Sequence, residues 1–138
     1  MSREQHLATV TAAYAAFGAG DIPAVLGHFD TDVEWVNQGP ADIEYFGTKR
    51  GHDGALAVFG FLGANIDISV FDPHTLVADD ERVVALVHVV GTARSTGATY
   101  DEETVHVFDF GPDGRVTRFR DFQDTAAVAG ALGNLALR

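Results

Sequence analysis

The feature that most constrains this chain is a turn near its C-terminus. Two apolar-rich segments, residues 104–110 and 115–124, flank the tetrapeptide Gly111-Pro112-Asp113-Gly114. Proline presets φ, aspartate bonds back to the turn backbone, and glycine accepts a positive φ, so this tetrapeptide predicts a turn. The chain is therefore expected to contain a β-hairpin made of two largely apolar strands.

Two polar residues stand in the apolar part of this hairpin. His106 alternates with Phe108 and Phe110, and Asp121 shares its face with Phe119, while two arginines take the opposite face. Faces rich in Phe usually point inward, so both polar side chains are predicted to lie on the buried side of the sheet. An even-length loop makes them diagonal neighbours, roughly 7–8 Å apart at Cα. We favour this register because the Phe and Arg faces then agree, whereas an odd loop with a glycine bulge changes the parity.

The buried pair has two interpretations. A carboxylate removed from water is costly unless it is hydrogen-bonded or has a function. His106 and Asp121 are therefore either a hydrogen-bonded structural pair in a core or the acid/base groups of a site.

Composition narrows the class of protein. The 138 residues predict a single domain, residues 1–138, with a substantial core. A net charge of −11 with scattered basic residues argues against nucleic-acid binding. The chain has no cysteine, no secretory leader is recognisable at its start, and no apolar run is long enough to span a membrane. A soluble cytoplasmic protein is the expectation, with acidic runs 79–81 and 101–103 in solvated loops.

Periodicity predicts helices first and strands afterwards. An apolar stripe at spacings of three and four predicts a helix over residues 3–19, and Asp21 followed by Pro23 predicts a short second helix. A third helix is predicted over residues 51–64, with Leu56 and Phe59 buried. The other predicted elements are strands at residues 33–37, 66–78, 82–95, 98–110 and 115–124, an irregular segment at 38–49, and a final helix at 125–135.

This order predicts an α+β fold with a curved antiparallel sheet and three N-terminal helices over its concave face. Such an arrangement leaves a cone-shaped hollow where a pocket is expected. The strand at residues 82–95 is apolar on both sides, so its convex face also needs covering, and a homodimer is predicted.

Further residues are candidates to line the pocket. Trp35 can form a flat wall for a ring-shaped ligand or can simply be core, and Phe59 faces the same hollow. His52 either lines the mouth or makes local bonds at a helix start. His88 faces the pocket or the dimer interface. The histidines show no tight spacing, so no metal site and no cofactor are predicted.

Several short motifs, in this order, resemble the nuclear transport factor 2-like superfamily and, within it, the SnoaL-like polyketide cyclases. The matching motifs are Tyr14-Ala15-Ala16-Phe17 with Gly20-Asp21, Phe29 to Trp35, Gly47 with Arg50-Gly51-His52, Gly91-Thr92-Ala93, and Gly114-Arg115-Val116 leading to Asp121 and Asp124-Thr125. The resemblance covers nearly the whole chain and implies a cone-shaped α+β barrel.

The resemblance also implies roles for single residues. Asp121 matches the acid/base of SnoaL-like cyclases, and His106 matches the histidine that accompanies it. In the related ketosteroid isomerases the catalytic base falls near Asn37, which cannot take a proton, and Tyr14 is one residue out of place. The cyclase dyad therefore carries over and the isomerase mechanism does not. Tyr14, Asn37 and Phe119 remain candidates for binding substrate.

Together these arguments predict a cofactor-independent enzyme that performs acid/base proton transfer on a carbonyl substrate: a cyclase, isomerase or dehydratase. The substrate would be a small apolar or polycyclic compound in an apolar pocket. The alternative is a non-catalytic ligand-binding or assembly domain of the same fold.

Overall fold

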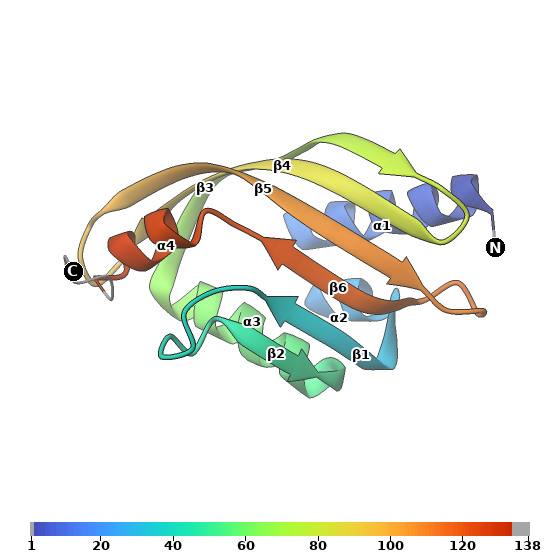
Figure 1. Cartoon of the computed structure of the whole chain (residues 1–138), viewed down its shortest axis with the longest axis horizontal. Helices are drawn as coiled ribbons and strands as arrows, with labels where there is room; N and C mark the ends of the chain where they lie inside the picture. The colour runs from blue at the N-terminus through green and yellow to red at the C-terminus, as the bar shows by residue number, and fades with distance from the viewer. Residues whose placement is uncertain (1, 134–138) are drawn as a thin grey trace.

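The computed structural model describes residues 2–133, and Figure 1 shows the arrangement of their helices and strands. In chain order the elements are α1 (Arg3–Gly18), α2 (Ile22–Leu26), β1 (Phe29–Asn37), β2 (Gly47–Arg50), α3 (Gly51–Asn65), β3 (Ile66–Ala78), β4 (Arg82–Ala93), β5 (Thr99–Phe110), β6 (Val116–Phe122) and α4 (Thr125–Ala131). The predicted last helix reached residue 135. It ends at Ala131, and residues 134 and 135 lie outside the described part.

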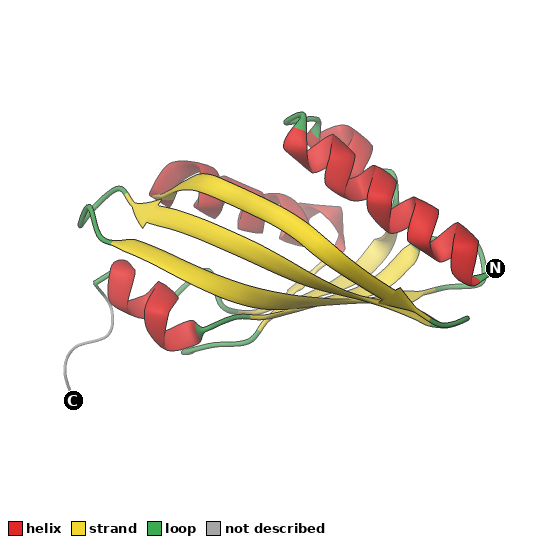
Figure 2. Ribbon diagram, turned by 90° about the horizontal axis from the view of Figure 1, so that it is seen from above, coloured by secondary structure: helices red, strands yellow, loops and turns green. Residues whose placement is uncertain are grey.

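One six-stranded sheet, in the order β2-β1-β6-β5-β4-β3, forms the body of the fold. It is curved and does not close on itself, and Figure 2 shows α1, α2 and α3 on one side of it. The α+β prediction is confirmed, but two details were wrong. Strand β1 runs parallel to β6, so the sheet is not wholly antiparallel. The segment expected to be irregular also contains β2, which pairs antiparallel with β1.

Local sequence signals account for where the helices begin. Ser2 caps α1 in a reciprocal capping box with Gln5, and the Asp21 side chain accepts a hydrogen bond from the backbone N–H of Ala24 at the start of α2. The face of α3 was misjudged. Ala55 and Val58 are buried, whereas Leu56 is 45% exposed. Nearly every residue of α3 is apolar or glycine, so its periodicity did not define a unique inner face.

The hairpin between β5 and β6 has a different register from the predicted one. Phe110 pairs with Val116, and a bulge leaves Thr117 without a partner before the ladder continues. As a result His106 lies directly opposite Asp121, instead of diagonally. The turn shifts the pairing by one residue and the bulge shifts it by one more. Because the total shift is even, His106 and Asp121 remain on the predicted inner faces.

Strand β4 has two apolar faces, as its alternation suggests. Val83, Ala85, Val87 and Val89 are buried against the core, while the residues between them are half-buried on the convex side.

No helix within residues 2–133 is long and apolar enough to cross a membrane.

Candidate active site

A cavity of about 90 Å³ lies between the helices and the concave face of the sheet. Its wall is mainly aromatic and includes side chains from α1, α3, β1, β3, β5 and β6. The polar groups of its lining are concentrated on β5, on β6 and in the segments next to them. Seven of the predicted site residues line it: Tyr14, Trp35, Asn37, Phe59, His106, Phe119 and Asp121.

Asp121 is the buried carboxylate at the centre of this polar region, with 8% of its surface exposed. Its Oδ1 accepts a hydrogen bond from the Thr104 hydroxyl at 2.6 Å and lies 3.5 Å from His106 Nε2. Its Oδ2 accepts one from Gln123 Nε2 at 2.9 Å. A carboxylate offers about four lone-pair sites. The two hydrogen bonds therefore hold the group in place, His106 faces it at the longer distance of 3.5 Å, and lone pairs remain for a further partner.

His106 connects Asp121 to the first helix. Its Nδ1 lies 2.7 Å from the Tyr14 hydroxyl. Burial raises the pKa of Tyr14, helped by the charge of Asp121, so the phenol keeps its proton and donates it to Nδ1. The imidazole proton is then on Nε2, the nitrogen that faces Asp121. Tyr14 thus sets the tautomer that directs an N–H towards the carboxylate.

Parallel pairing of β1 with β6 adds two more residues to the site. It sets Asn37 beside Asp121 and Trp35 beside Phe119. Asn37 Nδ2 donates to the Tyr45 carbonyl at 3.0 Å, which leaves Oδ1 buried without a partner among the described residues. The buried Trp35 Nε1 is likewise without a partner there. Buried polar atoms are normally paired, so these two are unsatisfied groups within the wall of the cavity.

Glu102 is a second carboxyl group in the cavity wall, and its position corrects the sequence analysis. The acidic run 101–103 was expected in a solvated loop, but it lies within β5, where Glu102 is only 6% exposed. Burial and the nearby charges of Asp121 and Asp124 raise the pKa of Glu102 to about 7, although the Asp124 N–H acts in the opposite direction. The site therefore contains two carboxyl groups with different surroundings.

The raised pKa of Glu102 predicts a pH dependence of stability. The folded chain holds this proton up to a pH of about 7, whereas the unfolded carboxyl loses it near 4.5. The free energy of unfolding should thus fall between these two pH values, by about 3 kcal/mol at most. Replacing Glu102 with Gln removes this fall, so the variant should gain stability relative to wild type as pH rises.

Urea unfolding at a series of pH values measures the effect. The matched control is Glu103→Gln, one residue along the strand, where the side chain is half-exposed and bonded to His74. Parallel stability curves for wild type and Glu102→Gln would contradict the assignment.

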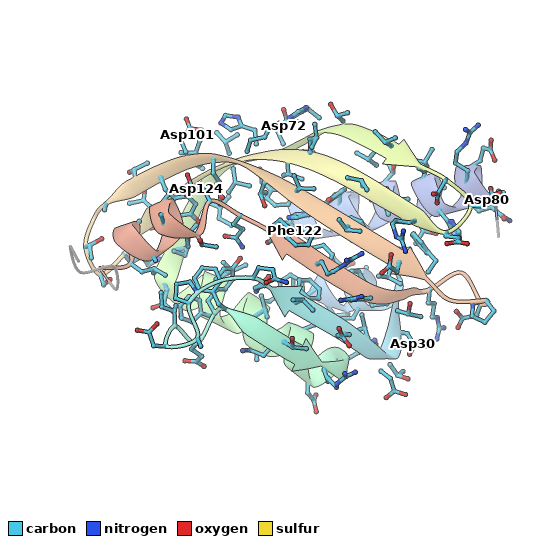
Figure 3. The ribbon with its side chains drawn as sticks, viewed as in Figure 1. Asp30, Asp72, Asp80, Asp101, Phe122 and Asp124 are labelled. Carbon is cyan, nitrogen blue, oxygen red and sulfur yellow. The ribbon has the colours of Figure 1, made fainter. Side chains whose placement is uncertain are left out.

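Two predicted site residues lie outside the cavity. His52 Nε2 donates to the Phe29 carbonyl at 2.9 Å, which makes it a helix-start residue with a backbone bond, the alternative considered above. His88 lies on the convex side of β4 and bonds to Asp101 at 2.7 Å, where Figure 3 labels that exposed aspartate. Neither histidine is part of the lining of this cavity.

Sequence reasoning missed five polar members of the lining: Tyr45, Tyr100, Glu102, Thr104 and Gln123. Thr104 and Glu102 could have been found, since they alternate with His106 on one face of β5. Tyr45 lies in a loop with no periodicity, so only the tertiary structure brings it to the site. Among residues 2–133, no group of three or more His, Asp or Glu side chains is placed to hold a metal ion.

Comparison with models of known protein families identifies the family of this chain. The family model of the SnoaL-like domain matches residues 10–119. The chain belongs to the SnoaL-like family. This SnoaL-like chain has the nuclear transport factor 2-like fold, as the structural matches below also indicate. No curated protein matches it closely enough to count as a relative.

Three solved structures are similar to this SnoaL-like chain. A nuclear transport factor 2-like protein from Burkholderia xenovorans LB400 is 30% identical, with a TM-score of 0.86 over 96% of this chain and 98% of that one. TerC, co-crystallised with polyporic acid, is 27% identical, with a TM-score of 0.82 over 94% and 98%. A candidate polyketide cyclase from Xanthomonas campestris pv. campestris is 24% identical, with a TM-score of 0.80 over 96% and 99%, and shows the fold alone.

Proposed function

We propose that this SnoaL-like chain is an enzyme that transfers a proton within a small carbonyl compound, as a cyclase, isomerase or dehydratase. The observation that carries this proposal is the buried Asp121 carboxylate in a largely aromatic cavity with room beside it. A carboxylate in such surroundings is a suitable general base for a proton next to a carbonyl group. All the groups that this step needs are side chains of the chain itself.

The step proceeds from Asp121 to the substrate. An unused lone pair of Asp121 takes the α-proton, the C–H bond breaks, and the electron pair moves into an enolate. His106 keeps Asp121 oriented, and its Nε2–H can also donate to the enolate oxygen. Return of the proton from Asp121 to another carbon completes an isomerisation. When the enolate instead attacks a second carbonyl to close a ring, the new C–C bond leaves an alkoxide, which takes the proton back from Asp121.

The cavity limits the size and polarity of the substrate. At about 90 Å³ it is smaller than the ~150 Å³ cavity that holds a benzene molecule, so a larger compound must extend through the opening or displace side chains. Among its polar lining residues are Glu102, His106 and Asp121. A compact ring that carries a carbonyl group, with part of it in the opening of the cavity, fits these features. The small molecule crystallised with TerC, polyporic acid, supports ligand binding by this fold.

Ligand binding without chemistry is the alternative. It is favoured by the existing bonds of Asp121 to Thr104 and Gln123, which a structural carboxylate also needs. In that case the cavity would hold a compound and leave its α-protons unchanged.

Exchange of α-protons decides between the two functions. Cyclohexanone, a compact ring ketone, is incubated with the protein in D₂O, and deuterium incorporation is followed by proton NMR. Wild type should accelerate exchange above the buffer rate, and Asp121→Asn should not. Acceleration that survives in Asp121→Asn would remove Asp121 as the base.

We also propose that the chain forms a homodimer through the convex face of the sheet. Val70, Val77 and Phe122 are exposed on β3 and β6, and Val84, Leu86 and Val90 of β4 are only half-buried. Figure 3 labels Phe122 on β6. Light scattering should give twice the mass of one chain at micromolar concentration, and Leu86→Lys should halve it. A wild-type monomer would contradict this interface.

A further inference from the structure

The second carboxyl group of the cavity belongs to Glu102, and the role proposed for Asp121 does not account for its position. Glu102, Thr104 and His106 are alternate residues of β5, so their side chains share the concave face at intervals of about 7 Å. Thr104, the middle one, donates to Asp121. Glu102 and His106 therefore flank the residue that holds the base, and all four line one cavity.

Hydrogen bonding sets the orientation of the Glu102 carboxyl. Its Oε1 accepts the backbone N–H of Asp124 at 2.8 Å, at the start of α4, where Figure 3 labels Asp124. Its Oε2 makes no hydrogen bond with any residue from 2 to 133. Because Oε1 is occupied as an acceptor, a proton on this carboxyl resides on Oε2. The group thus has one oxygen fixed to the backbone and the other available to donate.

The surroundings of Glu102 favour its neutral form. The titratable groups that face it are Asp121, Asp124, His106, Tyr45 and Tyr100. The two aspartates repel an additional negative charge, and no lysine or arginine contributes. The pKa of about 7 agrees with this geometry and keeps a useful fraction protonated near neutral pH.

We propose that Glu102 is the acid partner of Asp121: its Oε2–H protonates the substrate's carbonyl oxygen while Asp121 removes the α-proton. This inference rests on the proposed function and adds a second catalytic residue to it. The C–H bond breaks, its electron pair forms the C=C bond of an enol, and the carbonyl π pair takes the Glu102 proton. Asp121 ends protonated and Glu102 ionised. The reverse transfers, with Asp121 returning its proton to the same or another carbon, restore both groups without any co-reactant.

A neutral acid near the base has a specific value in this site. Transfer of the α-proton to Asp121 moves the negative charge of Asp121 onto the substrate. Protonation at oxygen as the C–H bond breaks moves that charge on to the Glu102 carboxyl, whose Oε1 accepts the Asp124 N–H, and leaves a neutral enol. His106 then acts on Asp121, through its Nε2–H, and Glu102 acts on the substrate oxygen.

The cyclohexanone exchange assay tests the assignment with three variants. Glu102→Gln keeps the acceptor for the Asp124 N–H and can still donate a hydrogen bond, but it cannot transfer a proton. Its exchange rate should fall ~10²-fold, the lower limit of what general acid catalysis typically contributes. Glu103→Gln, with the same charge change on the exposed side of the strand, should keep the wild-type rate. Asp121→Asn should lose acceleration.

The pH profile gives a second readout. The wild-type rate should decline as pH rises through about 7, where Glu102 loses its proton, and the Glu102→Gln profile should lack this decline. If circular dichroism shows that Glu102→Gln does not fold, Glu102→Asp is used in its place. That variant keeps an acidic proton on a side chain that is one methylene shorter. Its exchange rate should therefore fall, while the decline of the rate with rising pH remains.

The outcomes separate this inference from the proposed function. One outcome is a normal exchange rate in Glu102→Gln (or in Glu102→Asp, when that variant is needed) and a lost rate in Asp121→Asn. This outcome would leave Asp121 as the base and remove Glu102 as the acid. Glu102 would then be a cap for α4. A normal rate in both Glu102→Gln and Asp121→Asn, or no exchange by wild type, would overturn the proposed function and this inference with it.

Discussion

Replacing Asp121 with Asn should lower the rate of proton transfer by ~10²–10⁴-fold, the usual contribution of a general base. The amide has nearly the same shape as the carboxylate but no basic lone pair at neutral pH. Cyclohexanone exchange in D₂O measures the loss directly. The matched control is Asp101→Asn, which makes the same chemical change on an exposed side chain of β5 that contacts His88.

The same variant should fold almost as well as wild type. Its side-chain oxygen can still accept from one neighbour. Thr104 has a second acceptor, the Phe122 carbonyl at 3.0 Å, and the Gln123 amide can turn to present its oxygen. A structural pair predicts the opposite result, with a clear drop in melting temperature and no specific loss of turnover. Thermal unfolding and exchange rates of Asp121→Asn therefore have to be measured together.

Replacing Phe119 with Ala should cost about 3–5 kcal/mol of unfolding free energy, as is typical for a large aromatic side chain removed from a core. The ring is almost fully buried, with its centroid 4.3 Å from that of Trp35 and 5.0 Å from that of Phe108. It also lies 4.9 Å from the His106 ring. Its removal joins a new void to the existing cavity, so neighbouring rings lose contacts that they cannot replace.

Urea unfolding measures this loss against a surface control. Leu56→Ala removes a side chain of α3 that is 45% exposed and should cost no more than about 1 kcal/mol. Benzene should bind the enlarged cavity of Phe119→Ala and raise its melting temperature more than that of wild type. Equal losses in the two variants would show that Phe119 does not support the core as the packing indicates.

Local sequence determined much of this protein. Alternation of apolar and polar residues assigned His106 and Asp121 to inner faces, because a strand sends successive side chains to opposite sides. The capping residue Asp21 and the Gly-Pro-Asp-Gly turn located element boundaries, since both act through their nearest neighbours in the chain. The order of the elements then restricted the fold to helices packed on one curved sheet.

Only the tertiary structure decided how distant segments meet. The bulge at Thr117 set His106 opposite Asp121, and the parallel pairing of β1 with β6 brought Asn37 beside them. Glu102 looked like part of a solvated acidic run until the backbone of Asp124 and the cavity enclosed it. Alternation along a strand specifies which side chains share a face, but not which strand lies next to it or what covers it. Those depend on contacts between residues far apart in the chain, and they made two carboxyl groups members of one site.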